Sequence, residues 1–126
     1  MYKPKEGAVA FVEFFSTDPR ASKSFLENVF DWKMDTEEIA GTEIWFWEAA
    51  NGPEGHMMRP MGGMPPGTVA FVRVRSVDVV TRKVLKNGGK ILAPKYSVPG
   101  RGWFAWYEAP GGVVYAVYQP KPKRGK

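Results

Sequence analysis

Two short runs of alternating side chains, sixty positions apart, give the first indication of how the chain is organised. The run AVAFVEFFSTD begins at Ala8, and it returns as TVAFVRVRSVD from Thr68. Both runs are rich in β-branched and aromatic residues, and in both apolar side chains recur at every second position, which is the period of a β-strand. The pattern predicts strands over residues 9–15 and 69–75.

A helix is predicted after each of these strands. Asp18 is a residue type that caps helices, and Pro19 suits the first helical position. Five apolar side chains then fall on one helical face: Ala21, Phe25, Leu26, Val29 and Phe30. In the second half Ser76 is the predicted cap, and the apolar stripe consists of Val77, Val80 and Val84. The tripeptide Asn87-Gly88-Gly89 predicts the end of this second helix.

Three shorter strands are predicted after each helix, separated mostly by Gly, Pro and Asn. In the first half they cover about residues 32–38, 43–49 and 55–59. In the second half they cover about residues 90–95, 103–108 and 113–119. The chain is therefore predicted to fold as two βαβββ modules in tandem, which is an α+β architecture.

The two halves also share residues at equivalent positions. A shift of sixty positions places VAFV at residue 9 on VAFV at residue 69, and WFWEAANG at residue 45 on AWYEAPGG at residue 105. So many matches in a single register indicate an internal repeat. We interpret the chain as one domain made of two repeats, about residues 8–60 and 68–120, followed by a basic tail over residues 121–126.

Composition narrows the class of protein. A chain of 126 residues has the length of one domain, and 44% hydrophobic residues are too many for a disordered chain. No apolar run reaches the roughly 20 residues that span a membrane. Cysteine is absent, which excludes disulfides and thiolate metal ligands, and the first residues lack the apolar segment of a signal peptide. We expect a cytoplasmic protein with no membrane partner.

The net charge of +5 does not by itself predict a nucleic-acid partner. Four of the positive charges lie in the tail, at Lys121, Lys123, Arg124 and Lys126. The remainder of the chain is then close to neutral, and no aromatic residue interleaves with the tail charges as single-strand binders require. A solvated tail is the expectation, and a binding arm is the alternative.

Strand alternation assigns opposite roles to the two faces of the repeated strand. One face is entirely apolar and is expected to carry the helix: Ala10, Val12 and Phe14, and in the second half Ala70, Val72 and Val74. The opposite face mixes aromatic and charged residues: Phe11, Glu13 and Phe15, and in the second half Val69, Phe71, Arg73 and Arg75. That mixture is typical of a small-molecule pocket wall. The alternative is a solvated face, or a structural ion pair between Glu13 and Arg73.

A resemblance to a known family is carried by motifs in both halves. The first half contains STDPRASKSFLENVFDW, and the second contains a helix ending in NGG, then VPGRGWFAW, then a PGG turn before the last strand. From about residue 9 to residue 119 the chain resembles the vicinal oxygen chelate superfamily, which includes glyoxalase I, bleomycin-resistance proteins and extradiol dioxygenases. The resemblance implies a glyoxalase/bleomycin-resistance-like fold, with curved sheets around a site, and a homodimer.

Members of this superfamily commonly use a divalent metal that chelates two substrate oxygens. The resemblance places the four ligand positions at Phe11, His56, Val69 and Ala116. Three of these side chains carry no donor atom, and one imidazole does not supply the three or four donors that a cation needs. We therefore expect no metal cofactor, with a divalent metal at an atypical site as the alternative.

Three functions are consistent with these patterns. The leading hypothesis is a metal-free protein that encloses a small organic molecule, as the drug-sequestering bleomycin-resistance proteins do. The second is an enzyme, a lyase, isomerase or dioxygenase resembling glyoxalase I, with an atypical metal site or with Glu13 and His56 as acid and base. The third is an interaction module that uses the basic tail.

Seven residues are expected to line the ligand site: Phe11, Glu13, His56, Met58, Phe71, Arg73 and Tyr118. His56 is the one histidine of the chain, and a lone histidine is also commonly a packed residue. Further aromatic residues lie on matching strands of the two halves: Trp45, Phe46, Trp47, Trp103, Phe104, Trp106 and Tyr107. Most of these are expected in the core, and two or three at the site.

Overall fold

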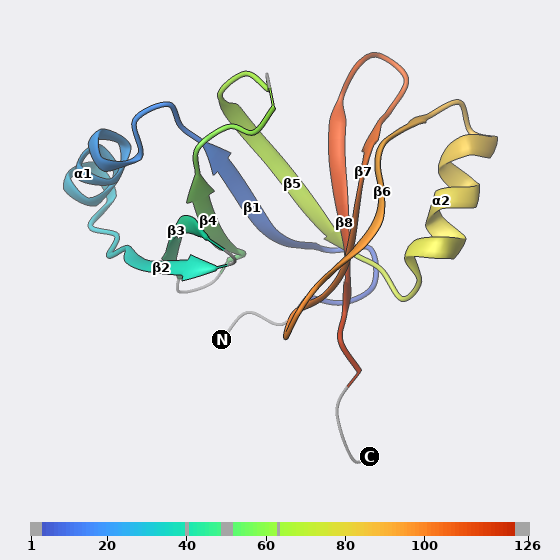
Figure 1. The fold of residues 1–126 in the computed structure, drawn as a ribbon, viewed down its shortest axis with the longest axis horizontal. Coiled ribbons are helices and arrows are strands. Elements are labelled where there is room, and N and C mark those ends of the chain that lie inside the picture. The colour runs from blue at the N-terminus through green and yellow to red at the C-terminus, as the bar shows by residue number, and fades with distance from the viewer. Residues whose placement is uncertain (1–3, 40, 49–51, 63, 123–126) are drawn as a thin grey trace. The chain divides into compact units, whose positions relative to one another are not determined.

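The computed structural model describes residues 4–39, 41–48, 52–62 and 64–122, shown as a ribbon in Figure 1. The chain divides into two compact units, one containing residues 11–69 and the other residues 4–10 together with residues 70–122. The last four residues of the predicted basic tail, 123–126, lie outside the described residues. Neither described helix has the length and apolar character that crossing a membrane would require.

The first unit is built from one helix and four hydrogen-bonded strands. Its elements are β1 (Val9–Phe15, of which residues 11–15 belong to this unit), α1 (Pro19–Phe30), β2 (Asp35–Ile39), β3 (Thr42–Trp47) and β4 (Glu54–Met58). The strand order is β2-β3-β4-β1, with β4 parallel to β1 and the other neighbours antiparallel.

The second unit repeats this order of elements. It consists of β5 (Gly67–Arg73), α2 (Val77–Lys86), β6 (Lys90–Val98), β7 (Gly102–Glu108) and β8 (Val114–Pro120). Its strand order is β6-β7-β8-β5, with β8 parallel to β5 and the other neighbours antiparallel. The prediction of an α+β fold with two βαβββ modules is confirmed.

Both helices begin at the residues that the sequence indicates. Asp18 accepts a hydrogen bond from the Ala21 N–H at 3.2 Å, and Ser76 accepts one from the Val79 N–H at 3.1 Å. Each cap satisfies a backbone donor that the first helical turn leaves unpaired. α2 ends at Asn87, as predicted, and α1 ends at Asp31 in the left-handed conformation.

Several strand boundaries differ from the prediction, and β5 covers residues 67–73 rather than 69–75. β2 begins at Asp35 rather than near Trp32, because Trp32 stacks on Trp47 at 4.8 Å and Met34 is buried in the core. β6 continues to Val98 rather than ending near Lys95. Its pairing with β7 shifts register on either side of Ala93, and such irregularities let a strand pass Pro94, which has no N–H.

Each helix covers the apolar face of its own sheet. In the first unit Val12, Phe14 and Leu26 pack on a core of Met34, Trp45, Trp47 and Met57. In the second unit α2 packs against β6, β7 and β8, and its valines meet Val74, Ala105, Tyr107 and Val117; Figure 1 shows α2 beside β6. The predicted helix-bearing face of each repeated strand is therefore confirmed.

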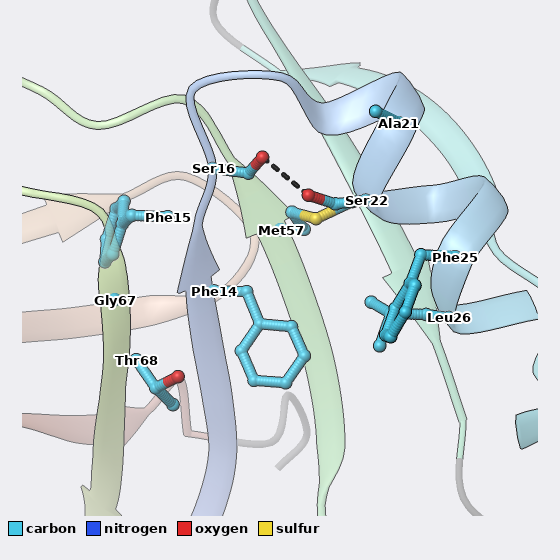
Figure 2. Close-up of a pocket in the computed structure, with 10 residues that line it drawn as sticks. All are labelled: Phe14, Phe15, Ser16, Ala21, Ser22, Phe25, Leu26, Met57, Gly67 and Thr68. Atoms are coloured by element: carbon cyan, nitrogen blue, oxygen red, sulfur yellow. Dashed lines mark hydrogen bonds between the residues drawn. The ribbon is translucent and has the colours of Figure 1, made fainter. Parts of the chain in front are cut away.

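The apolar stripe on α1 is only partly used. Leu26 packs on the core, but the side chains of Phe25, Val29 and Phe30 are 62%, 53% and 55% exposed. The space beside Phe25 is a pocket of about 450 Å³ between α1 and the sheet. Figure 2 shows Phe14, Phe25 and Leu26 around this pocket, with the Ser16 and Ser22 hydroxyls hydrogen-bonded at 2.7 Å.

Candidate functional site

The sheet face of the first unit that points away from α1 carries an acid and an imidazole side by side. The pairing of β1 with β4 places Glu13 opposite His56, and the pairing of β3 with β4 places Phe46 opposite His56. Phe11 and Phe15 precede and follow Glu13 by two residues, so strand alternation puts them on the same face. Strand register and alternation thus bring Phe11, Glu13 and Phe46 to the same face as His56.

Glu13 and His56 form a buried pair. Their side chains are 9% and 10% exposed, and His56 Nδ1 lies 3.5 Å from Glu13 Oε1. This separation exceeds the usual 2.7–3.2 Å of a hydrogen bond to oxygen, so the contact is a charge pair when the imidazole is protonated and a weak dipolar contact when it is neutral.

Two phenyl rings hold the imidazole between them. Phe11 stacks on His56 with ring centroids 4.6 Å apart, and Phe46 meets it edge-on at 4.9 Å. Stacked and edge-to-face arrangements are both favourable for aromatic rings. The rings fix the plane of the imidazole and surround the pair with apolar atoms, which strengthens the electrostatic interactions that the pair makes.

The second carboxylate oxygen of Glu13, Oε2, has a different environment. Oε2 is buried, and among the described residues no group hydrogen-bonds to it. Leaving a buried acceptor unpaired costs about 1 to 3 kcal/mol, and more for a charged group. Native proteins pair most buried polar atoms, so this oxygen requires a functional or structural explanation.

The other sequence-predicted site residues divide between the two units. Met58 follows His56 by two residues on β4 and lies opposite Phe15. Phe71, Arg73 and Tyr118 belong to the second unit. There Phe104 contacts both Phe71 at 5.9 Å and Tyr118 at 5.3 Å, and these three rings share the sheet face away from α2.

Arg73 has a contact that the sequence did not suggest. Its Nη1 donates a hydrogen bond to the Pro4 carbonyl at 3.0 Å, and its backbone pairs with Gly7 and Ala8 at 2.8 Å. Within its own unit Arg73 therefore fastens the segment that leads into β1, while Glu13 faces His56 in the other unit.

Phe46 is the site residue that sequence reasoning left undecided. It was one of seven strand aromatics without an assigned face, and the structure separates them by alternation. Phe46, Phe104 and Trp106 lie on the faces away from the helices, whereas Trp45, Trp47 and Tyr107 lie in the helix-side cores and Trp103 packs against one of them. Neighbouring residues of WFW (45–47) and WFAWY (103–107) point to opposite faces of their strands, so the face of each ring follows once one residue of the strand has been placed.

The residues present do not fit the superfamily's metal site. Of the four ligand positions, Phe11, Val69 and Ala116 have hydrocarbon side chains and only His56 has a donor atom. No cluster of three or more His, Asp or Glu side chains suited to a metal occurs in the part of the chain that the structure describes. Glu13 adds one oxygen donor beside His56, which still leaves fewer than the usual three protein ligands.

Comparison with proteins of known sequence identifies relatives over most of the chain. CFP32 of Mycobacterium tuberculosis, provisionally named a glyoxylase, is 26% identical over 121 residues, which are 91% of this chain and 46% of CFP32. The anthracycline biosynthesis protein DnrV of Streptomyces peucetius is 25% identical, over 90% of this chain and 47% of DnrV. The chain thus spans about half the length of the curated relatives it matches. No protein-family model matches it.

Solved structures share the fold. Methylmalonyl-CoA epimerase from Mycobacterium tuberculosis matches with a TM-score of 0.69 at 15% identity, over 97% of this chain and 94% of that one. A glyoxalase/bleomycin resistance protein/dioxygenase superfamily member from Vibrio splendidus matches with a TM-score of 0.64 at 16% identity, over 86% and 96%. The chain therefore has the glyoxalase/bleomycin-resistance-like fold, and its sequence similarity to CFP32 supports the resemblance to the vicinal oxygen chelate superfamily.

Proposed function

We propose that this protein binds a small organic molecule at the sheet face that carries Phe11, Glu13, Phe46 and His56. The observation that supports the proposal is the buried Glu13–His56 pair with its unpartnered Oε2, set between two phenyl rings. Small-molecule sites combine apolar walls with a few buried polar groups, and this face has both.

The names of the relatives support the class of ligand and not its identity. They are a glyoxylase, an anthracycline biosynthesis protein and a methylmalonyl-CoA epimerase, each of which implies a small organic molecule. These names describe different chemistries, and one fold hosts many functions. The site residues of this chain must therefore decide the ligand.

We also propose that no metal ion serves as a cofactor. The support is the donor set, in which Phe11, Val69 and Ala116 replace ligating side chains. Elemental analysis of the purified protein tests this, with zinc, nickel, manganese and iron offered during purification. Stoichiometric retention of any of them, lost on His56→Ala substitution, would contradict the proposal.

Binding is tested with a panel of small aromatic and aliphatic metabolites. Compounds that raise the melting temperature are then examined by NMR, since the chain has one histidine and its imidazole Hε1 gives a single signal. A true ligand shifts the His56 signal, and Phe46→Leu weakens its binding. If every stabilising compound leaves the His56 signal unchanged, the binding site is not on this face.

A second candidate function is proton transfer by Glu13 and His56. The 3.5 Å contact supports it, because an acid and a base must be within reach of a common substrate, and apo contacts of this kind are often long. Carbonyl compounds with an exchangeable α-hydrogen, incubated with the protein in D2O, should then incorporate deuterium. Activity should fall by at least a hundredfold in Glu13→Gln, and exchange that is equal in the variant would remove this candidate.

A further inference from the structure

The unpartnered oxygen of Glu13 restricts what kind of molecule the site can hold. An ionised carboxylate only accepts hydrogen bonds, and its Oε1 already faces His56 Nδ1 at 3.5 Å. Oε2 is buried and lacks a donor among the described residues. A ligand that brings a donor to Oε2 gains a charge-assisted hydrogen bond, whereas one that brings an acceptor or an anion adds repulsion.

The rings around the pair restrict the rest of the molecule. Phe11 stacks on the imidazole with an interplanar angle of 26°, and Phe46 presents its ring at 62° on a neighbouring strand. With His56 they form a ring cluster in which Phe11 and His56 are each only 8% exposed. A flat ring that enters this cluster loses little conformational freedom, because it has few rotatable bonds to fix.

Resting on the proposed function, we propose that the ligand is a planar aromatic compound with an O–H or N–H group on its ring, and that this group donates to Glu13 Oε2. The ring lies against Phe11, Phe46 and His56. Glu13 favours ligands that carry an O–H or N–H group, and the three rings contact the ligand whether or not it carries that group.

Two matched pairs of probes test this selection. The first pair is 2-naphthol and 2-methoxynaphthalene, and the second is indole and N-methylindole; in each pair the methyl group removes the donor and keeps the ring. Binding is followed by the His56 imidazole signal. We expect the donor compound of at least one pair to bind about tenfold or more tightly than its methylated partner, because a hydrogen bond to a charged acceptor favours it by that order.

Substitutions show which residues cause the tighter binding of the donor compound. Glu13→Met, which has no acceptor, should reduce the ratio of the two affinities to about one, while Glu38→Met, at an exposed position of β2, should leave the ratio unchanged. Phe46→Leu should weaken both compounds of a pair by similar factors. If Glu13→Met does not fold, the comparison of the probes on the unmodified protein still decides.

The outcomes separate this inference from the proposed function. If both compounds of each pair bind equally and shift His56, the site binds aromatic molecules and the donor requirement is wrong. If the preference survives Glu13→Met, another residue is responsible and the inference is also wrong. If other compounds of the metabolite panel shift His56 and neither probe pair does, the proposed function stands and the aromatic class is wrong. If no compound shifts His56, the proposed function itself fails.

Discussion

Gly55 on β4 shows how a single residue supports the strand that carries His56. A Cβ atom built at Gly55 would overlap the indole ring of Trp47, which lies across the neighbouring backbone. We therefore expect Gly55→Ala to lower the free energy of unfolding by about 1 to 3 kcal/mol, as overpacking of a core does. Thermal and urea unfolding measure it.

The cause is checked by a second substitution. Trp47→Leu opens the space that the new methyl group would occupy, so Gly55→Ala should cost much less in that background. Equal costs in the two backgrounds would show that the overlap with Trp47 is not the source.

We expect Tyr107 to make the folded protein less stable at alkaline pH. Burial raises the pKa of Tyr107 above its ordinary value of 10.0, partly opposed by the hydrogen bond with Thr81. The folded protein holds the Tyr107 proton more tightly than the unfolded chain does. The stability that this adds is therefore fully present below pH 10 and is lost as the pH rises through the pKa of the folded state. We expect the melting temperature to fall across this window.

Tyr107→Phe should remove that part of the pH dependence, at a cost of about 1 kcal/mol at neutral pH for the lost hydrogen bond. Tyr115→Phe is the matched control, because Tyr115 is exposed on the neighbouring strand. An alkaline decline that is the same in Tyr107→Phe as in the unmodified protein would contradict the assignment.

For single residues, the sequence predicts which side chains belong to the site more easily than it predicts which side chains touch each other. The alternation of apolar and polar side chains along residues 9–15 correctly predicted that Glu13 lies on the face of β1 that points away from α1. The neighbours of Glu13 depend on which residue of β4 lies beside it, and that register follows from long-range pairing. The repeat alone makes His56 a candidate, whereas the Phe46 contact and the hydrogen bond from Arg73 to the Pro4 carbonyl depend on pairing between distant segments.

The elements were predictable where the signal is local. Caps such as Asp18 and Ser76 act on the first turn of their own helices, so a few residues determine where each helix begins. The strand ends at Asp35 and Val98 were not predicted, because Trp32 is held by a ring on another strand and β6 continues through irregular pairing. The apolar stripe of α1 was also misleading, since most of it does not reach the core.

The two helices should consequently differ in how much they contribute to stability. Val84 of α2 packs on the core of its unit, whereas Val29 of α1 is 53% exposed. Val84→Ala should cost about 1 kcal/mol or more in unfolding free energy, because buried methyl groups are lost. Val29→Ala should cost close to nothing, since alanine is the better helix former.

Native-state hydrogen exchange gives an independent measure of the same difference. Amides of α1 should exchange at least about tenfold faster than those of α2, because fewer buried contacts must break for α1 to open. Equal protection of the two helices, or a large loss of stability in Val29→Ala, would mean that the α1 surface is covered in solution.

For the whole molecule, association is the property left to test. The superfamily resemblance implies a homodimer, and eleven large apolar side chains are exposed among the described residues, which is the kind of surface that association removes from water. Light scattering at micromolar concentration should give about twice the chain mass of 14.1 kDa, and dilution should lower the melting temperature, because dimerisation stabilises by mass action. A mass near 14.1 kDa with a melting temperature independent of concentration would make the monomer the functional unit, and every side chain in the site would then come from a single chain.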